Sequence, residues 1–407
     1  MSHLSFMEKL LDGVEVEWST LGDERYVKIA NSGRTPVKAS SRTAGSTPYY
    51  GANNIQDFVD GYTHDGVYLL IAEDGTASIE NYSIQWATGK FWANNHVHVI
   101  RGVGLLNSRF LFHYLHTVNF IPYLSGGGRA KLTKGEMIKI PTPIPCPENP
   151  TKSLEIQAEI VRILDTFTEL TTELTTELTT RKKQYNYYRD QLLSFEERGV
   201  EWKTLGDVTN KWYSGGTPRA RTPEYYEGGD IPWLRTQEVK FSDIERTQVK
   251  VTQAALDNSS AKWIPANCVI IAISGATAGR SAINKIPLTT NQHCGCLEID
   301  STKALDRYVF HWVSFNYENI KSLGQGARGD LNSSIIKNFK LPIPFADDPE
   351  KSLAEQDRIV AILDKFDALT SSITEGLPRE IELRQKQYEY YRDLLLSFPK
   401  PDSEVAA

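Results

Sequence analysis

The stretch TELTTELTTELTTRKKQYNYYRDQLLSF, residues 168–195, repeats a four-residue unit, and its ending returns near the end of the chain as RQKQYEYYRDLLLSF, residues 384–398. Leucine recurs every four residues at Leu170, Leu174 and Leu178. This spacing keeps the leucines near one face of an α-helix. The stretch therefore predicts a long helix, and its returning ending predicts a second helix of related sequence.

The repetition extends well beyond this stretch. VEWSTLGD at 16–23 returns as VEWKTLGD at 200–207, and PIPCPENPTKSLEIQAEIVRILDTF at 143–167 is matched by PIPFADDPEKSLAEQDRIVAILDKF at 342–366. Arg129 and Leu132 are in register with Arg328 and Leu331 upstream of these segments. The segments 24–125 and 208–323 share little. A chain that repeats its frame and varies two inserts suggests two different surfaces held on one repeated frame.

Each constant segment is predicted to form a helix that Ser153 or Ser352 caps after a proline-rich loop. Apolar residues spaced by three and four predict one stripe per helix and an antiparallel pair in a pseudo-two-fold arrangement. Gly376 and Pro378 are expected to interrupt the second helix. These two helices are called spacer helices, and the residues expected on their apolar stripes are Leu170, Leu174, Leu178, Leu369 and Ile373.

The variable blocks have a different composition, rich in Gly, Asn, Thr, Tyr and Trp. Short apolar runs such as 67–71 and 268–273 are bounded by Gly, Pro and Asp, which is typical of strands. The predicted class is α/β (α+β), with two globular domains that are each mainly β with some helix. The expected divisions are an N-terminal constant segment 1–23, a first domain 24–150, a central spacer helix 151–198, a second domain 199–350, and a C-terminal spacer helix and tail 351–407.

Length and composition are those of an ordinary globular protein. The 407 residues allow two to three domains. No apolar run is long enough to span a membrane, and MSHLSFMEKLLDG lacks the pattern of a signal peptide. Four cysteines are too few for a disulfide framework in so long a chain, so we expect a reducing, cytoplasmic location.

The charge distribution bears on nucleic-acid binding. The chain carries a net charge of −6. Residues 24–150 hold 12 Lys and Arg against 9 Asp and Glu, and residues 208–350 hold 16 against 15. The acidity therefore lies in the repeated segments, which weakens the charge objection to DNA binding in the variable blocks but supplies no strong basic signal.

The paired segments PIPxxxxPxKSL…Q…IVxILDxF and KQYxYYRDxLLSF resemble the specificity subunits of type I restriction–modification enzymes, and the resemblance covers the whole chain. The TTEL run resembles the IC subclass. The resemblance implies that each variable block is a target recognition domain that reads one half of a split site in double-stranded DNA. The helices would space these domains and carry two methylation subunits, with restriction subunits joining the complex.

The same resemblance implies that adenine methylation and ATP-dependent cleavage belong to the partner subunits. S-adenosylmethionine, ATP and Mg would accordingly bind there, and we expect no cofactor in this chain. Within the second block, SGGTPRARTPEYYEGGDIPWLRTQEV at 214–239 and IPANCVIIAISGATAGR at 264–280 resemble the opening and central strands of such domains. The first block lacks an SGGTP opening, so its N-terminal boundary is less defined.

Base edges are read by Arg, Lys, Asn and Gln on loops beside a rigid sheet. Candidate DNA-binding residues in the first block are Tyr49, Tyr50, Asn53, Lys90, Trp92, Asn94, Asn95, His96, Arg129 and Lys131. In the second block they are Arg219, Arg221, Arg235, Gln237, Ser274, Thr277, Arg280, Asn291, Gln292, His293, Gln325 and Arg328. Asn and Gly in loops also form turns, so some of these residues could serve the backbone alone.

A metal site is weakly supported by the sequence. His293, Cys294, Cys296 and Cys268 offer suitable atoms but lack the spacing of zinc sites, so buried thiols are the favoured reading and no metal is expected. His113 and His116 are expected on a helix surface.

No catalytic motif is found. A GxxxxGK[ST] loop and an Asn/Asp-Pro-Pro-Tyr/Phe motif are both absent, so no catalytic residue is expected. Two alternatives from other classes stay open at this point: a coiled-coil adaptor with two protein-binding domains, and a metal-dependent nuclease. Tyr185, Tyr188 and Arg189, with their counterparts Tyr388, Tyr391 and Arg392, could dock partners or pack between helices.

The repeat length suggests a way to set distance along DNA. One TTEL unit adds roughly 6 Å of helix and a net rotation of about 40°. B-DNA advances roughly 3.4 Å and about 35° per base pair. The rotation therefore corresponds to about one base pair, and the added length to between one and two. We expect each unit to change the unread spacer of a split site by one base pair.

Overall fold

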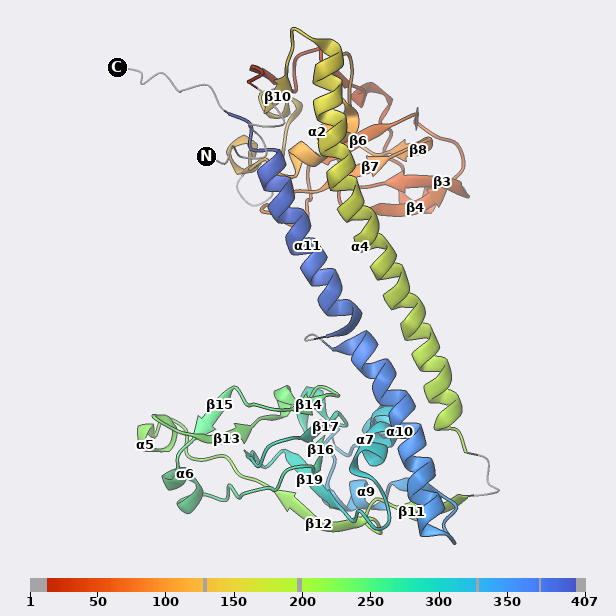
Figure 1. Ribbon diagram of the computed structural model, residues 1–407, viewed down its shortest axis with the longest axis vertical. Coiled ribbons are helices and arrows are strands. Elements are labelled where there is room, and N and C mark those ends of the chain that lie inside the picture. Colours follow the sequence, from red (N-terminus) through yellow and green to blue (C-terminus); the bar gives the residue numbers. More distant parts are fainter. Residues whose placement is uncertain (1–12, 127–129, 196–199, 327–328, 373–374, 400–407) are drawn as a thin grey trace. The chain divides into compact units, whose positions relative to one another are not determined.

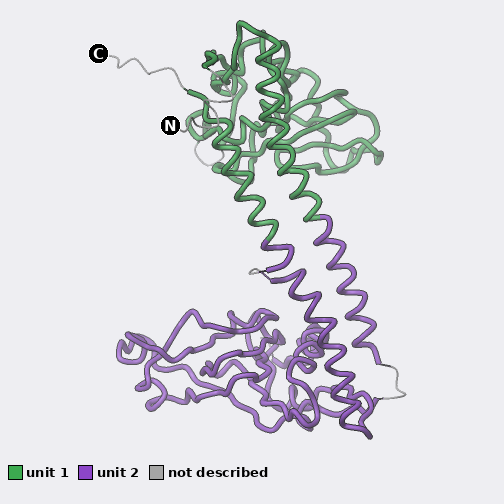
Figure 2. The backbone as a smooth tube through the Cα atoms, in the orientation of Figure 1, with its two compact units in different colours: residues 1–175, 380–407 green, residues 176–379 purple. Residues whose placement is uncertain are grey.

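The computed structural model describes residues 13–126, 130–195, 200–326, 329–372 and 375–399 (Figure 1). The chain divides into two compact units (Figure 2). Unit 1 contains residues 1–175 and 380–407, and unit 2 contains residues 176–379. Each unit therefore contains one variable block together with parts of both constant segments.

Unit 1 is built on two four-stranded sheets with the orders β2-β9-β6-β7 and β4-β3-β8-β5. The helix α2 packs against β6, β7 and β9, and every residue of β6 is buried. The strands are β2 (Val27–Ile29), β3 (Ala44–Tyr50), β4 (Ile55–Val59), β5 (His64–Asp65), β6 (Tyr68–Ala72), β7 (Ile84–Ala87), β8 (Lys90–Ala93) and β9 (Val97–Gly102); the helices are η1 (Asn31–Gly33), η2 (Ala39–Ser41), α2 (Ser108–Leu115), η3 (Ile121–Tyr123) and α3 (Lys134–Met137).

Unit 2 has a five-stranded sheet, β12-β19-β16-β17-β14, and a three-stranded sheet, β15-β13-β18. The central strand β16 is again fully buried, and α7 packs against β16 and β17. The strands are β12 (Thr209–Ser214), β13 (Ile231–Leu234), β14 (Asp243–Ile244), β15 (Val249–Val251), β16 (Val269–Ala272), β17 (Ser281–Asn284), β18 (Thr289–Thr290) and β19 (Cys294–Ile299); the helices are α5 (Pro223–Tyr226), η4 (Thr236–Glu238), α6 (Gln253–Asp257), η5 (Gly275–Thr277), α7 (Asp306–Phe315), α8 (Tyr317–Ser322) and α9 (Ser333–Asn338).

The repeated sequence closes both units in the same way. β1 (Val16–Thr20) pairs antiparallel with β10 (Pro141–Pro145), and Trp18 lies opposite Pro143. β11 (Val200–Thr204) pairs with β20 (Lys340–Pro344) in the same register, with Trp202 opposite Pro342. Each pair forms an isolated two-stranded sheet, where prolines are tolerated because a strand there has a free edge.

The constant helices are α4 (Pro150–Leu192), α10 (Pro349–Ser371) and α11 (Gly376–Leu395). The second constant segment forms two helices, α10 and α11, and not one continuous helix, which confirms the predicted interruption near Gly376. This residue has φ +77°, and a Cβ atom there would lie 2.4 Å from the carbonyl oxygen of Ala368. Only glycine adopts such a conformation without strain.

The predicted helix starts are wrong by a few residues. Asn149 and Asp348 accept hydrogen bonds from the amides of Lys152 and Lys351 and so cap the first turns. Ser153 and Ser352 instead lie within the helices, buried, and their hydroxyl oxygens accept from Gln157 and Gln356. Each cap lies four residues earlier than predicted, because this places a proline, Pro150 or Pro349, in the first turn, where proline is favoured.

The TTEL segment lies on the least buried part of α4. The buried residues of this helix end at Leu164; Leu170 is exposed, whereas Leu174, Leu178 and, on α10, Leu369 are half-buried. Ile373 lies outside the described residues. Threonine is satisfied here because its hydroxyl donates to the carbonyl four residues earlier, as from Thr171 to Phe167 and from Thr175 to Thr171.

In unit 1, α11 runs antiparallel to the first part of α4 (Figure 1). Phe167 stacks on Tyr391 with ring centroids 5.2 Å apart, and Phe398 meets Phe110 of α2. In unit 2, Tyr185 and Tyr188 at the end of α4 pack against Phe366 of α10. The two units therefore use equivalent aromatic contacts.

Candidate nucleic-acid interface

Three loops meet at the end of the central strand β6 in unit 1. We name residues 73–83 loop A, residues 94–96 turn B, and residues 125–126 with 130–131 loop C. The amide of Glu73 donates to the carbonyl of His96 at 2.8 Å, and the carbonyl of Glu73 accepts from the amide of Leu132 at 2.7 Å. Backbone hydrogen bonds therefore join loop A to turn B and to Leu132, the residue that follows loop C.

The same junction forms in unit 2 around Ile273, at the end of β16. In unit 2, loop A is 273–280, turn B is 291–293, and loop C is 325–326 with 329–330. The amide of Ile273 donates to the carbonyl of His293 at 2.9 Å, and its carbonyl accepts from the amide of Leu331 at 2.8 Å. Two blocks of unlike sequence therefore present three loops on one backbone frame.

Turn B has the pattern Asn-x-His in both blocks. The side-chain oxygens of Asn94 and Asn291 accept from the amides of His96 and His293 at 2.8 and 3.0 Å. These Asx turns fix the loop and leave the middle residues, Asn95 and Gln292, exposed. The shared pattern, in WANNHVHV and TTNQHCGC, is a signal that could have aligned the two blocks from sequence.

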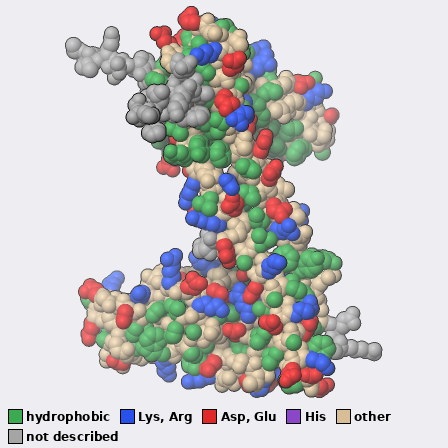
Figure 3. All heavy atoms as spheres, in the orientation of Figure 1, with side chains coloured by type: hydrophobic (Ala, Val, Ile, Leu, Met, Phe, Trp, Pro, Cys, Tyr) green, Lys and Arg blue, Asp and Glu red, His purple; other side chains and the backbone are tan. Residues whose placement is uncertain are grey.

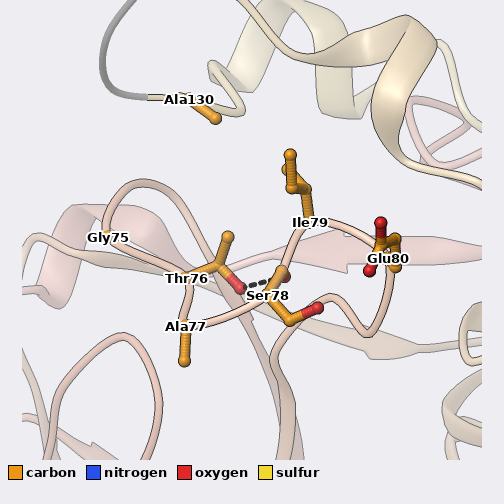
Figure 4. A pocket seen from close by; sticks show the side chains of 7 residues that line it. All are labelled: Gly75, Thr76, Ala77, Ser78, Ile79, Glu80 and Ala130. Atoms are coloured by element: carbon orange, nitrogen blue, oxygen red, sulfur yellow. Dashed lines mark hydrogen bonds between the residues drawn. The ribbon is translucent and has the colours of Figure 1, made fainter. Parts of the chain in front are cut away.

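A hollow of about 440 Å³ lies between loops A and C of unit 1. Figure 4 shows Ile79 reaching toward Ala130 across it, with Thr76 and Ser78 at its floor. The hydroxyl of Thr76 donates to the carbonyl of Ser78 at 2.8 Å, which holds the bend of loop A. The walls carry exposed apolar and hydroxyl groups, which suit contacts with base edges and methyl groups.

Several candidates in unit 1 support the fold. Tyr49 and Asn94 are buried. The hydroxyl of Tyr49 bonds to the backbone of Val37, and its ring stacks on Trp92. Tyr50 packs edge-on against Phe91. Packing holds Tyr49 inward and a turn holds Asn94 inward, whereas Tyr50 is half-buried and its role at DNA stays a prediction.

The remaining candidates of unit 1 lie at the surface. Asn53 braces loop A, since its side chain donates to the carbonyl of Gly75 and accepts from the amide of Ala77. Lys90 lies over the ring of Tyr62, and His96 pairs with Asp74. Lys131 pairs with Glu73 at 3.1 Å. Arg129 lies outside the described residues.

In unit 2 the exposed candidates are Arg219, Arg221, Gln237, Gln292, His293 and Gln325, and the half-buried ones are Arg235, Ser274, Thr277, Arg280 and Asn291. Arg235 is paired with Glu238 and Gln248. Arg328 lies outside the described residues. The candidates around turn B and loops A and C lie on the junction described above, whereas Arg219, Arg221, Arg235 and Gln237 lie near the three-stranded sheet.

Charge is locally balanced. On the face shown in Figure 3, Lys and Arg are interspersed with Asp and Glu. Sequence reasoning missed Glu73, an acidic group at the junction that forms ion pairs with Arg34 and Lys131. The residue directly follows a buried strand, where the second block has Ile273, and only the fold reveals its cationic neighbours.

Three of the four cysteines, Cys268, Cys294 and Cys296, lie in the core of unit 2, and Cys146 is half-buried in unit 1. Burial raises the pKa of Cys268 and of Cys294 to about 12, so both thiols are protonated at neutral pH. His293 is exposed, while Cys294 and Cys296 are buried. Across the described ranges, no group of three or more His, Cys, Asp and Glu could hold a metal ion.

A repeated polar network fastens each sheet domain to its helix. In unit 1, Asp165 of α4 accepts from Arg109 and from His113, both at 2.8 Å. In unit 2, Asp364 of α10 accepts from Arg307 at 2.7 Å and from His311 at 2.6 Å. The expectation that His113 lies on a helix surface is wrong, since the residue is buried and its other ring nitrogen bonds to Tyr388.

The chain thus has two units whose surface loops differ in sequence but are joined by the same backbone hydrogen bonds. It matches the family described as type I restriction modification DNA specificity domain over residues 14–181 and again over 197–383. The chain therefore belongs to the specificity subunits of type I restriction–modification enzymes, which are non-catalytic subunits. This assignment displaces the adaptor and nuclease alternatives.

Two relatives from Escherichia coli support the assignment along the full length. The EcoR124I/EcoR124II specificity subunit is 42% identical, with 99% of each chain covered. The EcoprrI specificity subunit is 32% identical over 92% of this chain and 93% of its own. The fold is also similar to a crystal structure of a type I restriction–modification S subunit from M. genitalium, with TM-score 0.64 at 14% identity, covering 96% of this chain and 98% of that one.

Among the residues that the structure describes, every helix is either too short or too polar to cross a bilayer.

Proposed function

We propose that each unit reads one half of a split DNA site through loop A, turn B and loop C. The observation that carries this proposal is the common junction at Glu73 and Ile273, which holds unlike side chains on the same backbone hydrogen bonds. Loops on a rigid frame are the usual carriers of base contacts, because the frame fixes where each donor and acceptor points. Different side chains on one frame would give two different half-sites.

The direct test is to map methylated adenines in DNA from cells that carry this chain and its partner subunits. We expect one split motif with two unlike halves around unread bases. Asn95→Ala in unit 1 and Gln292→Ala in unit 2 form a matched pair, since both change the exposed middle residue of turn B. Each should relax one half only, and a variant that alters both halves equally would contradict the proposal.

Specificity subunits assemble with methylation and restriction subunits and bind DNA. We propose that two methylation subunits dock on the two copies of KQYxYYRD. Tyr187 and Tyr390 occupy matched positions there, 58% and 65% exposed, whereas Tyr185 and Tyr388 pack inward. Identical exposed aromatic groups in the constant segments suit two copies of one partner, because tyrosine is enriched at protein interfaces.

Single and double variants test this docking. Tyr187→Ala and Tyr390→Ala should each remove one methylation subunit from the complex, and the double variant should remove both, as measured by native mass spectrometry. Asn186→Ala, an exposed neighbour that differs between the two copies, serves as the control. Full assembly of the double variant would contradict the proposed surface.

The cofactors follow from this division of labour. S-adenosylmethionine, ATP and Mg would bind to the partner subunits, while this chain recognises the DNA sequence. We propose a cytoplasmic location for the complex, where the DNA and the reduced cysteines both belong.

A further inference from the structure

Glu73 differs from its counterpart Ile273 in side chain but not in backbone role. Both residues donate to turn B and accept from the residue that follows loop C. Ile273 packs against the apolar core of unit 2. At the same junction Glu73 carries a carboxylate, which forms ion pairs instead.

The carboxylate of Glu73 meets three basic side chains from three segments. It lies 2.6 Å from Nη1 of Arg34, 3.1 Å from Nζ of Lys131 and 3.7 Å from Nδ1 of His98. Only 16% of the Glu73 side chain is exposed, and His98 is fully buried. Burial alone would raise the pKa of Glu73, but hydrogen bonds from Arg34 and Lys131 outweigh it and keep the pKa below its ordinary value.

Each partner is fixed in turn to a part of the interface. Arg34 also donates to the carbonyl of Val97 at 2.8 Å, directly after turn B. His98 donates from Nε2 to the carbonyl of Leu132, directly after loop C, and its Nδ1 accepts from Asn31. Lys131 belongs to loop C itself. The carboxylate therefore connects loop A by charge to the segments that carry turn B and loop C.

We propose that Glu73 is a positioning residue for the half-site read by unit 1, holding Lys131 and loop C against loop A. This inference rests on the proposed function of the loops. Lys131 would otherwise be a free cation near DNA phosphates, attracting any sequence equally. When Lys131 is paired with Glu73, its attraction to DNA phosphates of any sequence is weaker and the position of loop C is fixed.

The test uses the complete complex with its methylation subunits and the variant Glu73→Gln, which removes the charge but keeps the shape. Discrimination at the unit 1 half-site, measured by methylation of a library of split sites, should fall roughly tenfold, as for the loss of one good base contact. Retention on unrelated DNA should become stronger, and its salt dependence steeper by about one released counterion, because Lys131 is set free. The unit 2 half-site should be unchanged.

The two opposite changes separate positioning from damage, since a poorly folded unit would weaken both kinds of binding. Glu73→Asp, which restores the charge with a shorter reach, should recover part of the discrimination and serves as the second variant if Glu73→Gln fails to assemble. Ile273→Val is the matched control in unit 2 and should change neither readout. Unaltered discrimination at the unit 1 half-site in both Glu73 variants, or equal loss at both half-sites, would overturn the inference. A wild-type complex without any split site would instead overturn the proposed function.

Discussion

Asp165 and Asp364 occupy the same position in the two copies of ILDxF, and each accepts from an arginine and a buried histidine on a sheet-domain helix. Replacing Asp165 by Ala leaves His113 and Arg109 without this acceptor. Because unsatisfied buried donors are costly, the free energy of unfolding of unit 1 should fall by about 1–3 kcal/mol. Hydrogen exchange of the intact chain, resolved by peptide, measures the loss in each unit.

Asp364→Ala is the matched variant and should lower protection in unit 2 instead. Asp165→Asn keeps an acceptor oxygen and should have a smaller effect than Asp165→Ala. Loss of protection spread equally over both units would show that the network does not stabilise its own unit.

Two buried histidines, His98 and His113, and one half-buried histidine, His116, make unit 1 sensitive to acid. Burial lowers the pKa of His98, His113 and His116 below the ordinary value of 6.5. As pH falls below 6.5, the unfolded chain binds protons at these sites before the folded chain does, so folding stability is lost. We expect unit 1 to lose protection between neutral pH and pH 5, as measured by hydrogen exchange corrected for intrinsic rates.

His113→Asn, which keeps a donor for Asp165, should flatten this pH dependence. The Asp165 carboxylate acts in a separate window. Burial opposes its ionisation, but hydrogen bonds from His113 and Arg109 lower its pKa below 3.8, so its contribution is lost only in stronger acid. A steeper loss in the His113→Asn variant would contradict the assignment.

Residue types predicted the interface only in part. Asn95, Gln292 and Lys131 lie at the junction as a reader of loop composition would expect. Tyr49 is buried, because strands β3 and β8 pair in parallel and bring Tyr49 opposite Trp92, which no local pattern reveals. Glu73 was missed for the same reason: its three partners come from segments far apart in the sequence.

At the scale of elements, the four-residue repeat sets the length of α4. Deleting Thr175–Leu178 removes one unit, roughly 6 Å of helix and a net rotation of about 40°. We expect the unread spacer of the split site to shorten by one base pair, with both half-sites unchanged, as measured by mapping methylated adenines. The threonine hydroxyls keep their bonds to carbonyls four residues earlier, because the deletion preserves this period.

A deletion of two residues, Thr175 and Thr176, is the control. It rotates the rest of α4 by about 200°, so the leucine face is lost and modification should fail. A change in half-site letters, or an unchanged spacer after the four-residue deletion, would contradict a measuring role for the repeat.

Helix existence was predictable because long periodic segments carry strong signals, whereas helix ends were not. Gly376 indicated the break between α10 and α11, because glycine readily adopts the positive φ that the structure shows there and other residues avoid. The caps shifted to Asn149 and Asp348, because serine, asparagine and aspartate compete for this position and only the surrounding turn decides. The exposure of Leu170 shows that a regular apolar spacing does not guarantee burial.

At the scale of the whole molecule, the end of the chain completes unit 1. Leu395, Leu396 and Phe398 are buried in its core, and the carbonyl of Pro399 accepts from the indole of Trp18 at 2.7 Å. Truncation after Leu394 removes three buried apolar side chains at about 1.5–3 kcal/mol each, a large share of a domain's stability. We expect unit 1 to become sensitive to limited proteolysis while unit 2 stays resistant.

Matched point variants refine this test. Phe398→Ala should weaken unit 1, and Phe195→Ala, at the equivalent position of the first constant segment, should weaken unit 2, where it packs against Trp312. Equal effects of both variants on one unit would contradict the division of the chain.

The repeated frame, the mixed α/β class and the interrupted second helix could all be predicted from the sequence, since duplicated segments and glycine leave direct traces. The composition of each unit could not. Which part of a helix packs against which domain depends on contacts such as His113 with Tyr388, whose positions are 275 residues apart.

Unit 1 is assembled from both extremities of the polypeptide, whereas unit 2 is a continuous segment. During translation, every residue of unit 2 therefore leaves the ribosome before the second segment of unit 1, which begins at residue 380. The core of unit 1 therefore stays incomplete until Leu395, Leu396 and Phe398 have been synthesised. Premature termination of synthesis would accordingly spare the later-made reader and leave the earlier one unfinished.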